Sequence, residues 1–134
     1  MRYQRAELPL RLDGLAAAQS FFAGCFAQGN PSREELWVAH TDEQAHCIHM
    51  SRHPGDETGA VFPLRAIIAD AVEHGSAGIL LAHNHPSGDP TPSGDDRIVT
   101  EQLVAAGRLL DIPVHDHVII GRGRYTSFAQ AGLL

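Results

Sequence analysis

Residues 77–96 read AGILLAHNHPSGDPTPSGDD, and the main features of the predicted fold follow from them. Residues 77–82 are almost entirely apolar, which indicates a strand buried on both faces of a sheet. Three prolines between residues 86 and 92 then predict a stiff loop. Ser93 opens a helical pattern that continues to residue 110. A buried strand followed by a loop and a helix is a typical unit of an α/β protein.

The segments on either side of this unit alternate between helical and strand patterns. Apolar spacing and turn residues predict helices at residues 12–28, 63–75 and 93–110 and strands at residues 35–40, 45–50, 77–83, 113–120 and 125–128. Asp13 is the expected N-cap of the first helix, and residues 53–56 are expected to form a loop. This alternation predicts an α/β sandwich around a central sheet.

Composition indicates one soluble globular domain over residues 1–134, with 43% apolar and 19% charged residues. The formal net charge of −6 disfavours a general nucleic-acid surface. No stretch is as long as a membrane span, and the N-terminus lacks the apolar core of a signal peptide. Cys25 and Cys47 are too few for a disulfide framework. We therefore expect buried thiols and a cytoplasmic location.

Two histidines and a nearby carboxylate form a candidate metal site. His83 and His85 are separated by one residue, so in an extended chain their side chains point the same way. Asp96 follows at the start of the predicted helix, with Asp95 as the alternative. Two histidines and a carboxylate, with one position left for water, are the ligand set of a catalytic zinc site, although iron, cobalt or nickel also suit it. Ser93 and Asp96 also have capping-box spacing, a role that competes partly with metal binding.

The motif resembles that of a known family. His83-Asn84-His85-Pro86, six residues, Ser93, two residues and Asp96 resemble the JAMM motif of the JAB/MPN metallopeptidases. Residues 82–93 and 116–121 look like the bacterial RadC branch. The likeness covers residues 32–128. Residues 1–31 are expected to form a helical lead-in, without the helix-hairpin-helix region typical of RadC proteins.

The resemblance implies a fold, a cofactor and a set of roles. The fold would be a three-layer JAB/MPN-like sandwich, similar to cytidine deaminase, with a mixed central β-sheet flanked by helices. One Zn²⁺ per chain would be held by His83, His85 and Asp96, and Ser93 would stabilise the oxyanion. The implied activity is that of a zinc metallopeptidase acting on a peptide or isopeptide bond.

The family also uses a glutamate at the start of an early strand as general base. Glu34 and Glu35 both fit this position, and strand alternation places them on opposite faces of the sheet. Glu35 is favoured because it lies directly before the first apolar residue of the strand. It would take a proton from the attacking water. Both residues could instead be solvated charges at the end of a loop.

Two other functions remain open at this point. The chain could be a non-catalytic MPN-type module that holds a protein partner, which the loss of a ligand or of the glutamate would indicate; neither is lost. It could also be a RadC-like protein associated with DNA repair, although its acidic charge gives this little support. The sequence indicates neither the substrate nor the oligomeric state.

Two further features bear on the site. RadC proteins usually carry Val-His-Pro-Arg-Glu before the second helix, whereas residues 61–65 read VFPLR and residues 51–59 also fit the family pattern poorly. These departures put any transfer of substrate preference in doubt. Structural or solvent-facing roles are expected for the remaining histidines, with a supporting role near the site open for His117 and its neighbour Asp116; these histidines are His40, His46, His49, His53, His74, His115 and His117.

Overall fold

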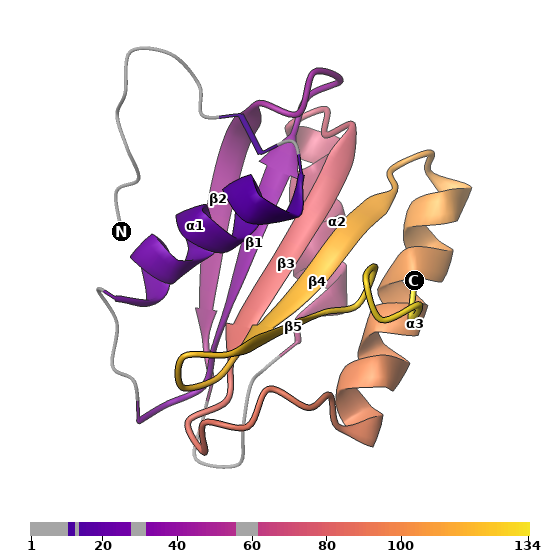
Figure 1. The fold of residues 1–134 in the computed structure, drawn as a ribbon. Helices are drawn as coiled ribbons and strands as arrows, with labels where there is room; N and C mark the ends of the chain where they lie inside the picture. The colour runs from indigo at the N-terminus through magenta and orange to yellow at the C-terminus, as the bar shows by residue number, and fades with distance from the viewer. Residues whose placement is uncertain (1–10, 13, 28–31, 56–61) are drawn as a thin grey trace.

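The computed structural model describes residues 11–12, 14–27, 32–55 and 62–134, which form three layers around one mixed sheet (Figure 1). Helix α1 covers one face of the sheet, and α2 and α3 cover the other. The elements are α1 (Leu15–Phe26), β1 (Glu35–Thr41), β2 (Cys47–Pro54), α2 (Leu64–Glu73), β3 (Gly78–Asn84), α3 (Gly94–Leu109), β4 (Val114–Ile120) and β5 (Tyr125–Ser127). The predicted α/β sandwich is confirmed.

The sheet has the strand order β2-β1-β3-β4-β5. Strand β1 is antiparallel to both β2 and β3, β3 is parallel to β4, and β4 is antiparallel to β5. Every residue of the two central strands, β1 and β3, is buried. The apolar run at residues 79–82 therefore fills the middle of the molecule, as expected for a strand covered on both faces.

Strand alternation divides the interior into two cores. Trp37 and Ala39 of β1 face α1, where they pack with Phe22. Leu36 and Val38 point to the opposite face and pack beneath α2 and α3. Any side chain in register with Leu36 therefore lies on the α2/α3 side of the sheet.

The largest differences from the predicted boundaries lie at α1 and β2. The first helix begins at Leu15 rather than residue 12, because the backbone N–H of Leu12 donates to Ala45 O at 2.7 Å and holds the preceding segment against the β1–β2 turn. The predicted cap Asp13 lies outside the described residues. Strand β2 continues to Pro54, where a loop was predicted, because β1 pairs with it as far as the Glu35–Pro54 pair. Proline is tolerated there because β2 is an edge strand.

Two expectations from composition can be compared with the fold. Cys25 and Cys47 are both buried, as predicted. Desolvation raises the pKa of Cys25 to about 11, and the neighbouring Cys47 adds to this shift. Within the described part of the chain, no helix is long and apolar enough to cross a membrane.

Candidate metal centre

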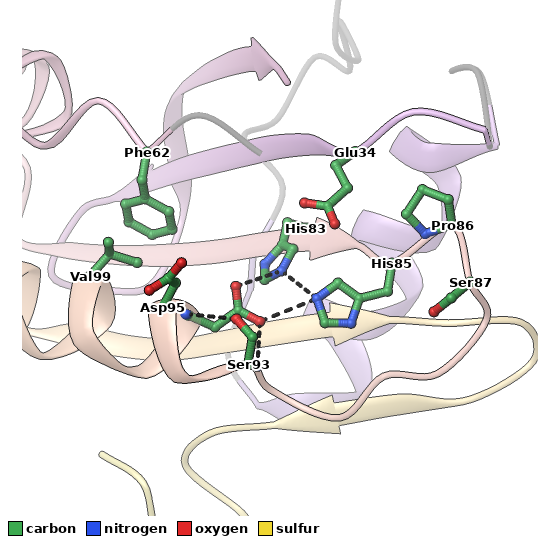
Figure 2. A pocket seen from close by; sticks show the side chains of 10 residues that line it. Glu34, Phe62, His83, His85, Pro86, Ser87, Ser93, Asp95 and Val99 are labelled. Carbon is green, nitrogen blue, oxygen red and sulfur yellow. Dashed lines mark hydrogen bonds and ion pairs between the residues drawn. The ribbon is translucent and has the colours of Figure 1, made fainter. Parts of the chain in front are cut away.

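The sequence motif folds into one wall of a pocket of about 380 Å³ (Figure 2). His83 comes from the end of β3, His85 from the first turn of the following loop and Asp96 from the first turn of α3. Glu34 projects toward the two histidines from the segment just before β1. The structure thus brings together the three predicted ligands, which come from a strand, a loop and a helix, at the edge where β3 ends.

The three side chains have the spacing of ligands on one ion. The Nε2 atoms of His83 and His85 are 3.0 Å apart. The carboxylate oxygens of Asp96 lie 3.3 Å from His83 Nε2 and 3.2 Å from His85 Nε2. Two atoms bound to one tetrahedral zinc at about 2.0–2.1 Å are roughly 3.3–3.4 Å apart. The group can therefore hold a metal ion with small side-chain adjustments.

A chain of buried hydrogen bonds determines which nitrogen of His83 faces the pocket. Thr100 donates its only hydroxyl proton to the carbonyl of Asp96 at 2.7 Å, so it can only accept from His117 Nδ1, also at 2.7 Å. A neutral His117 then carries its proton on Nδ1 and accepts at Nε2, which lies 2.7 Å from His83 Nδ1. His83 must donate from Nδ1, which leaves the lone pair of its Nε2 directed at the pocket.

His85 reaches the same state by a separate contact. Its Nδ1 lies 2.8 Å from the carbonyl oxygen of Asp89, which can only accept a hydrogen bond. His85 therefore donates from Nδ1 and also presents Nε2 to the pocket. Anchoring the second imidazole nitrogen in this way is usual for histidines that bind metal. Two lone pairs and a carboxylate that meet at about 3 Å require a cation, either a proton or a metal ion, between them.

The pKa shifts at the site agree with this arrangement. Burial raises the pKa of Asp96, but hydrogen bonds to His83 and His85 outweigh it and hold the pKa well below its ordinary value. The hydrogen bond to Asp96 raises the pKa of His85, against the effect of partial burial. Complete burial lowers the pKa of His117 well below its ordinary value, which keeps its ring neutral. Asp96 therefore stays ionised next to the two histidines.

Asp96 caps helix α3 and still directs its carboxylate toward the two histidines, so helix capping does not exclude metal binding. Its Oδ2 accepts a hydrogen bond from the backbone N–H of Ser93 at 2.8 Å, while its own N–H donates to Ser93 Oγ at 3.0 Å. This capping box orients the carboxylate toward both histidines without using all of its lone pairs. Ser93 lines the pocket beside it, and so does Asp95.

The two glutamates are separated by strand alternation, but in the opposite sense to the prediction. Glu35 lies on the α1 side of the sheet, where its buried carboxylate pairs with Arg52; Arg52 Nε donates to Oε2 at 2.7 Å. Glu34 lines the pocket with the metal-binding group (Figure 2). Glu34 rather than Glu35 therefore shares the pocket with the three candidate ligands, because adjacent residues of an extended chain cannot both face α2 and α3.

Asn84, between the two motif histidines, fixes the segment that carries Glu34. Its Oδ1 accepts from the backbone N–H of Glu35 at 2.8 Å, and its Nδ2 donates to the carbonyl of Arg33 at 3.0 Å. These bonds bracket Glu34 on both sides. Asn84 of β3 thus fixes the position of the Glu34 backbone relative to the three candidate metal ligands.

The loop between His85 and α3 is held by close backbone contact. Gly88 has a φ of 91° and its carbonyl accepts from the N–H of Arg122 at 3.1 Å. A Cβ at Gly121 would collide with the carbonyl oxygen of Gly88. This packing fixes the loop that supplies the Asp89 carbonyl to His85.

The apolar side chains of Phe62 and Val99 also line the pocket. Phe62 occupies the position at which the family resemblance leads one to expect histidine. Its ring also packs against His117, with centroids 5.8 Å apart. The departure noted in the sequence therefore falls in the lining of the pocket itself.

Sequence reasoning did not assign three residues that shape the site: Asn84, Thr100 and His117. His117 belongs to the RadC-like text, but the parallel register of β3 and β4 was needed to place it behind His83. Its neighbour Asp116 has a different role, because its carboxylate accepts from Ser127 Oγ at 2.6 Å and from the N–H of Ala129 at 3.0 Å. Those bonds join β4 to the C-terminal turn.

Comparison with known proteins shows which family the chain matches. Residues 15–133 match the model of the family described as the RadC-like JAB domain. A UPF0758 protein of Symbiobacterium thermophilum is 48% identical over 80 residues, which are 60% of this chain and 34% of that protein. A UPF0758 protein of Chloroflexus aggregans is 46% identical over 98 residues, 73% of this chain and 41% of the relative. One from Chloroflexus aurantiacus is 58% identical over 67 residues, 50% of this chain and 29% of the relative. The chain thus spans well under half the length of these relatives.

Proposed function

Because the chain belongs to the RadC-like JAB domain family, we propose that it is a metal-dependent hydrolase of the JAMM type that cleaves peptide or isopeptide bonds. One observation carries the proposal. The hydrogen bonds of His83 and His85 direct two Nε2 lone pairs at the Asp96 carboxylate, with Glu34 in the same pocket. A site that only binds a metal ion would not need a further carboxylate, that of Glu34, beside the three ligands.

Zinc is the ion that fits this donor set best. Two imidazole nitrogens and one carboxylate are typical of catalytic zinc sites, which keep a position open for water or substrate. The ligands would be His83, His85 and Asp96. When bound, such an ion lowers the pKa of its water and polarises the carbonyl to be attacked.

Glu34 is proposed as the general base. Its carboxylate would accept a proton from the attacking water and pass it to the leaving amine. Asn84 holds the backbone on both sides of Glu34, so the carboxylate is positioned before substrate arrives. Such preorganisation avoids an ordering cost in the transition state.

Ser93 is proposed to stabilise the oxyanion. Its Oγ accepts a hydrogen bond from the N–H of Asp96 and therefore keeps its hydroxyl proton available for the pocket. A donor aimed at developing negative charge contributes roughly 3–4 kcal/mol of transition-state stabilisation in comparable sites. Phe62 and Val99 would place an apolar side chain of a peptide or protein substrate next to the scissile bond.

The test is a peptidase assay with matched glutamate variants. Zinc-loaded protein is incubated with a mixed peptide library and the products are identified by mass spectrometry. Wild type and Glu35→Gln should cleave the same bonds, whereas Glu34→Gln should bind zinc normally and lose at least about 100-fold in rate. Equal activity of Glu34→Gln and wild type would contradict the mechanism. A loss of activity confined to Glu35→Gln would instead identify Glu35 as the general base.

A further inference from the structure

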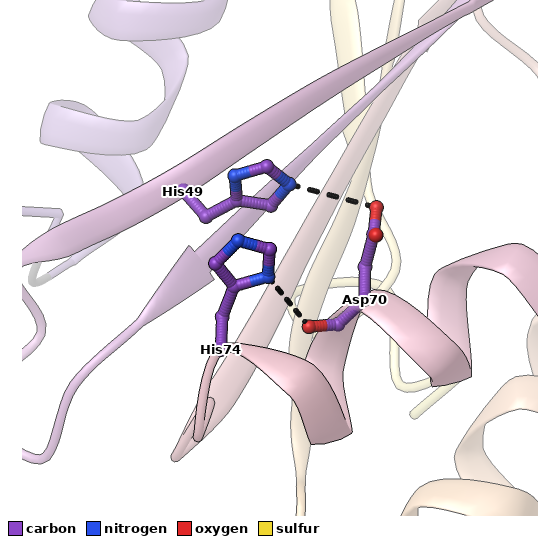
Figure 3. A group of neighbouring side chains, drawn as sticks. All are labelled: His49, Asp70 and His74. Atoms are coloured by element: carbon purple, nitrogen blue, oxygen red, sulfur yellow. Dashed lines mark hydrogen bonds and ion pairs between the residues drawn. The ribbon is translucent and has the colours of Figure 1, made fainter.

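A second group of candidate metal ligands lies between β2 and α2 (Figure 3). His49 belongs to β2, while Asp70 and His74 come from α2 and the residue that caps it. His40 of β1 is directly paired with His49 in the sheet. Leu36, which is paired with His83, is four residues from His40, or roughly 13 Å along the strand. The two groups are therefore separate sites.

The side chains of His49, Asp70 and His74 are close enough to share one ion. His49 Nε2 lies 3.5 Å from Asp70 Oδ2. One ligand atom from each of His49, Asp70 and His74 lies within 4.8 Å of the other two. Asp70 and His74 are four residues apart, so both project from one side of the helix toward β2. This side chain set matches that of the first site.

The tautomer of His74 is also suited to metal binding. Its Nδ1 lies 2.9 Å from the carbonyl oxygen of Asp70 and must donate to it. The lone pair of Nε2 is therefore free for a ligand. The ring is stacked on His49 with centroids 3.7 Å apart and an interplanar angle of 10°. Because His74 is exposed, its ring can tilt out of this stack to meet an ion.

His40 supplies an independent observation. Its side chain is fully buried (0% exposed), and among the described residues neither ring nitrogen has a hydrogen-bond partner. Leaving such polar atoms without partners costs free energy. The ring centroid is 5.4 Å from that of His49 and 6.5 Å from that of His74. Burial, and to a lesser extent the neighbouring His49, lowers the pKa of His40 to about 4, so the ring stays neutral.

We propose that His49, Asp70 and His74 bind a second divalent transition-metal ion, with His40 as the inner candidate for a fourth ligand. Imidazole and carboxylate ligands favour zinc, nickel or copper over magnesium or calcium, which prefer oxygen ligands. The ion would join α2 to the edge strand β2. Its role would be structural, because the group is far from Glu34 and the first three ligands.

Zinc stoichiometry by elemental analysis and titration calorimetry tests this site. Wild type should bind two zinc ions per chain and His74→Asn only one. In a background lacking the first site, His85→Gln/Asp96→Asn, one ion should still bind. Adding His74→Asn or Asp70→Asn to that background should weaken binding at least about 100-fold. His115→Asn, which removes an exposed histidine elsewhere, is the matched control and should change nothing.

A second readout separates loss of binding from loss of folding. Zinc should raise the melting temperature of the His85→Gln/Asp96→Asn background, since an ion that binds only the folded state stabilises it. Magnesium should have no effect. The rise should disappear with His74→Asn, whose circular dichroism spectrum should match that of the background. Absence of zinc binding in the background, or binding that His74→Asn and Asp70→Asn leave unchanged, would overturn the proposal.

Discussion

Replacing His117 with phenylalanine should weaken zinc binding although His117 is not a ligand. The ring is fully buried and stacks on Phe128 with centroids 4.6 Å apart, so phenylalanine fills the same space. It lacks the Nε2 atom that accepts from His83 Nδ1 at 2.7 Å. His83 can then rotate or change tautomer, and its Nε2 lone pair no longer has a fixed direction.

The size of the effect follows from the lost hydrogen bond. A buried donor without its acceptor costs about 1–3 kcal/mol. At 1.4 kcal/mol per factor of ten, His117→Phe should lower zinc affinity by roughly 5- to 150-fold. Thr100→Val removes the hydroxyl that fixes His117 and should give a smaller loss than His117→Phe, because the ring of His117 and its Nε2 atom remain in place. Thr100→Ser keeps the hydroxyl and should bind zinc as the parent does.

Chelator competition measures these affinities directly. The variants are made in a His74→Asn background, so that only the site at His83 contributes, and thermal melts show that each variant is folded. The tautomer argument would be refuted if folded His117→Phe retained zinc affinity within about twofold of the parent. It would also fail if Thr100→Ser were as impaired as Thr100→Val.

Three further predictions concern other parts of the structure. Asn84→Ala should lower kcat while metal content stays unchanged, because it releases the backbone on both sides of Glu34; steady-state kinetics with elemental analysis checks this. Glu35→Gln should cost about 1–3 kcal/mol of unfolding free energy in urea titrations, because the buried carboxylate loses its ion pair with Arg52. Cys25 has its pKa raised from 9.0 to about 11, so the folded state binds more protons than the unfolded state in that interval. The free energy of unfolding should therefore fall by about 3 kcal/mol as pH rises through the interval, and Cys25→Ala should lose this part of the slope in urea titrations.

Local patterns were sufficient for much of the fold. The apolar run before His83 predicts a central strand because few other elements bury every residue, and Ser93 marks the start of α3 through its capping box. The boundaries that were wrong depend on partners distant in sequence. Strand β2 reaches Pro54 only because β1 continues beside it, and no local rule predicts that length.

The site followed the same division. The spacing of His83, His85 and Asp96 is a local signal, and it was enough to predict the group that could hold a metal ion. Alternation predicts that Glu34 and Glu35 face opposite sides, but only packing of β1 between two helical layers determines which side faces the pocket. Adjacency to the first apolar residue therefore did not identify the glutamate that lines the pocket.

The second histidine group had only the four-residue spacing of Asp70 and His74 as a local signal. His49 and Asp70 are 21 positions apart in the chain and come from a strand and a helix, so no short motif links them. They meet because α2 lies over the sheet beside the β1–β2 edge. Counting histidines predicts such a group only once the topology is known.

Metal content is the most direct test of the central claim that His83, His85 and Asp96 hold an ion. It should be measured by elemental analysis on His74→Asn and on His74→Asn/Asp96→Asn, both purified without added metal, so that the second group does not contribute. The account predicts one zinc ion per chain in the first protein and none in the second. Equal metal content in the two proteins, or no stoichiometric metal in the first, would contradict it.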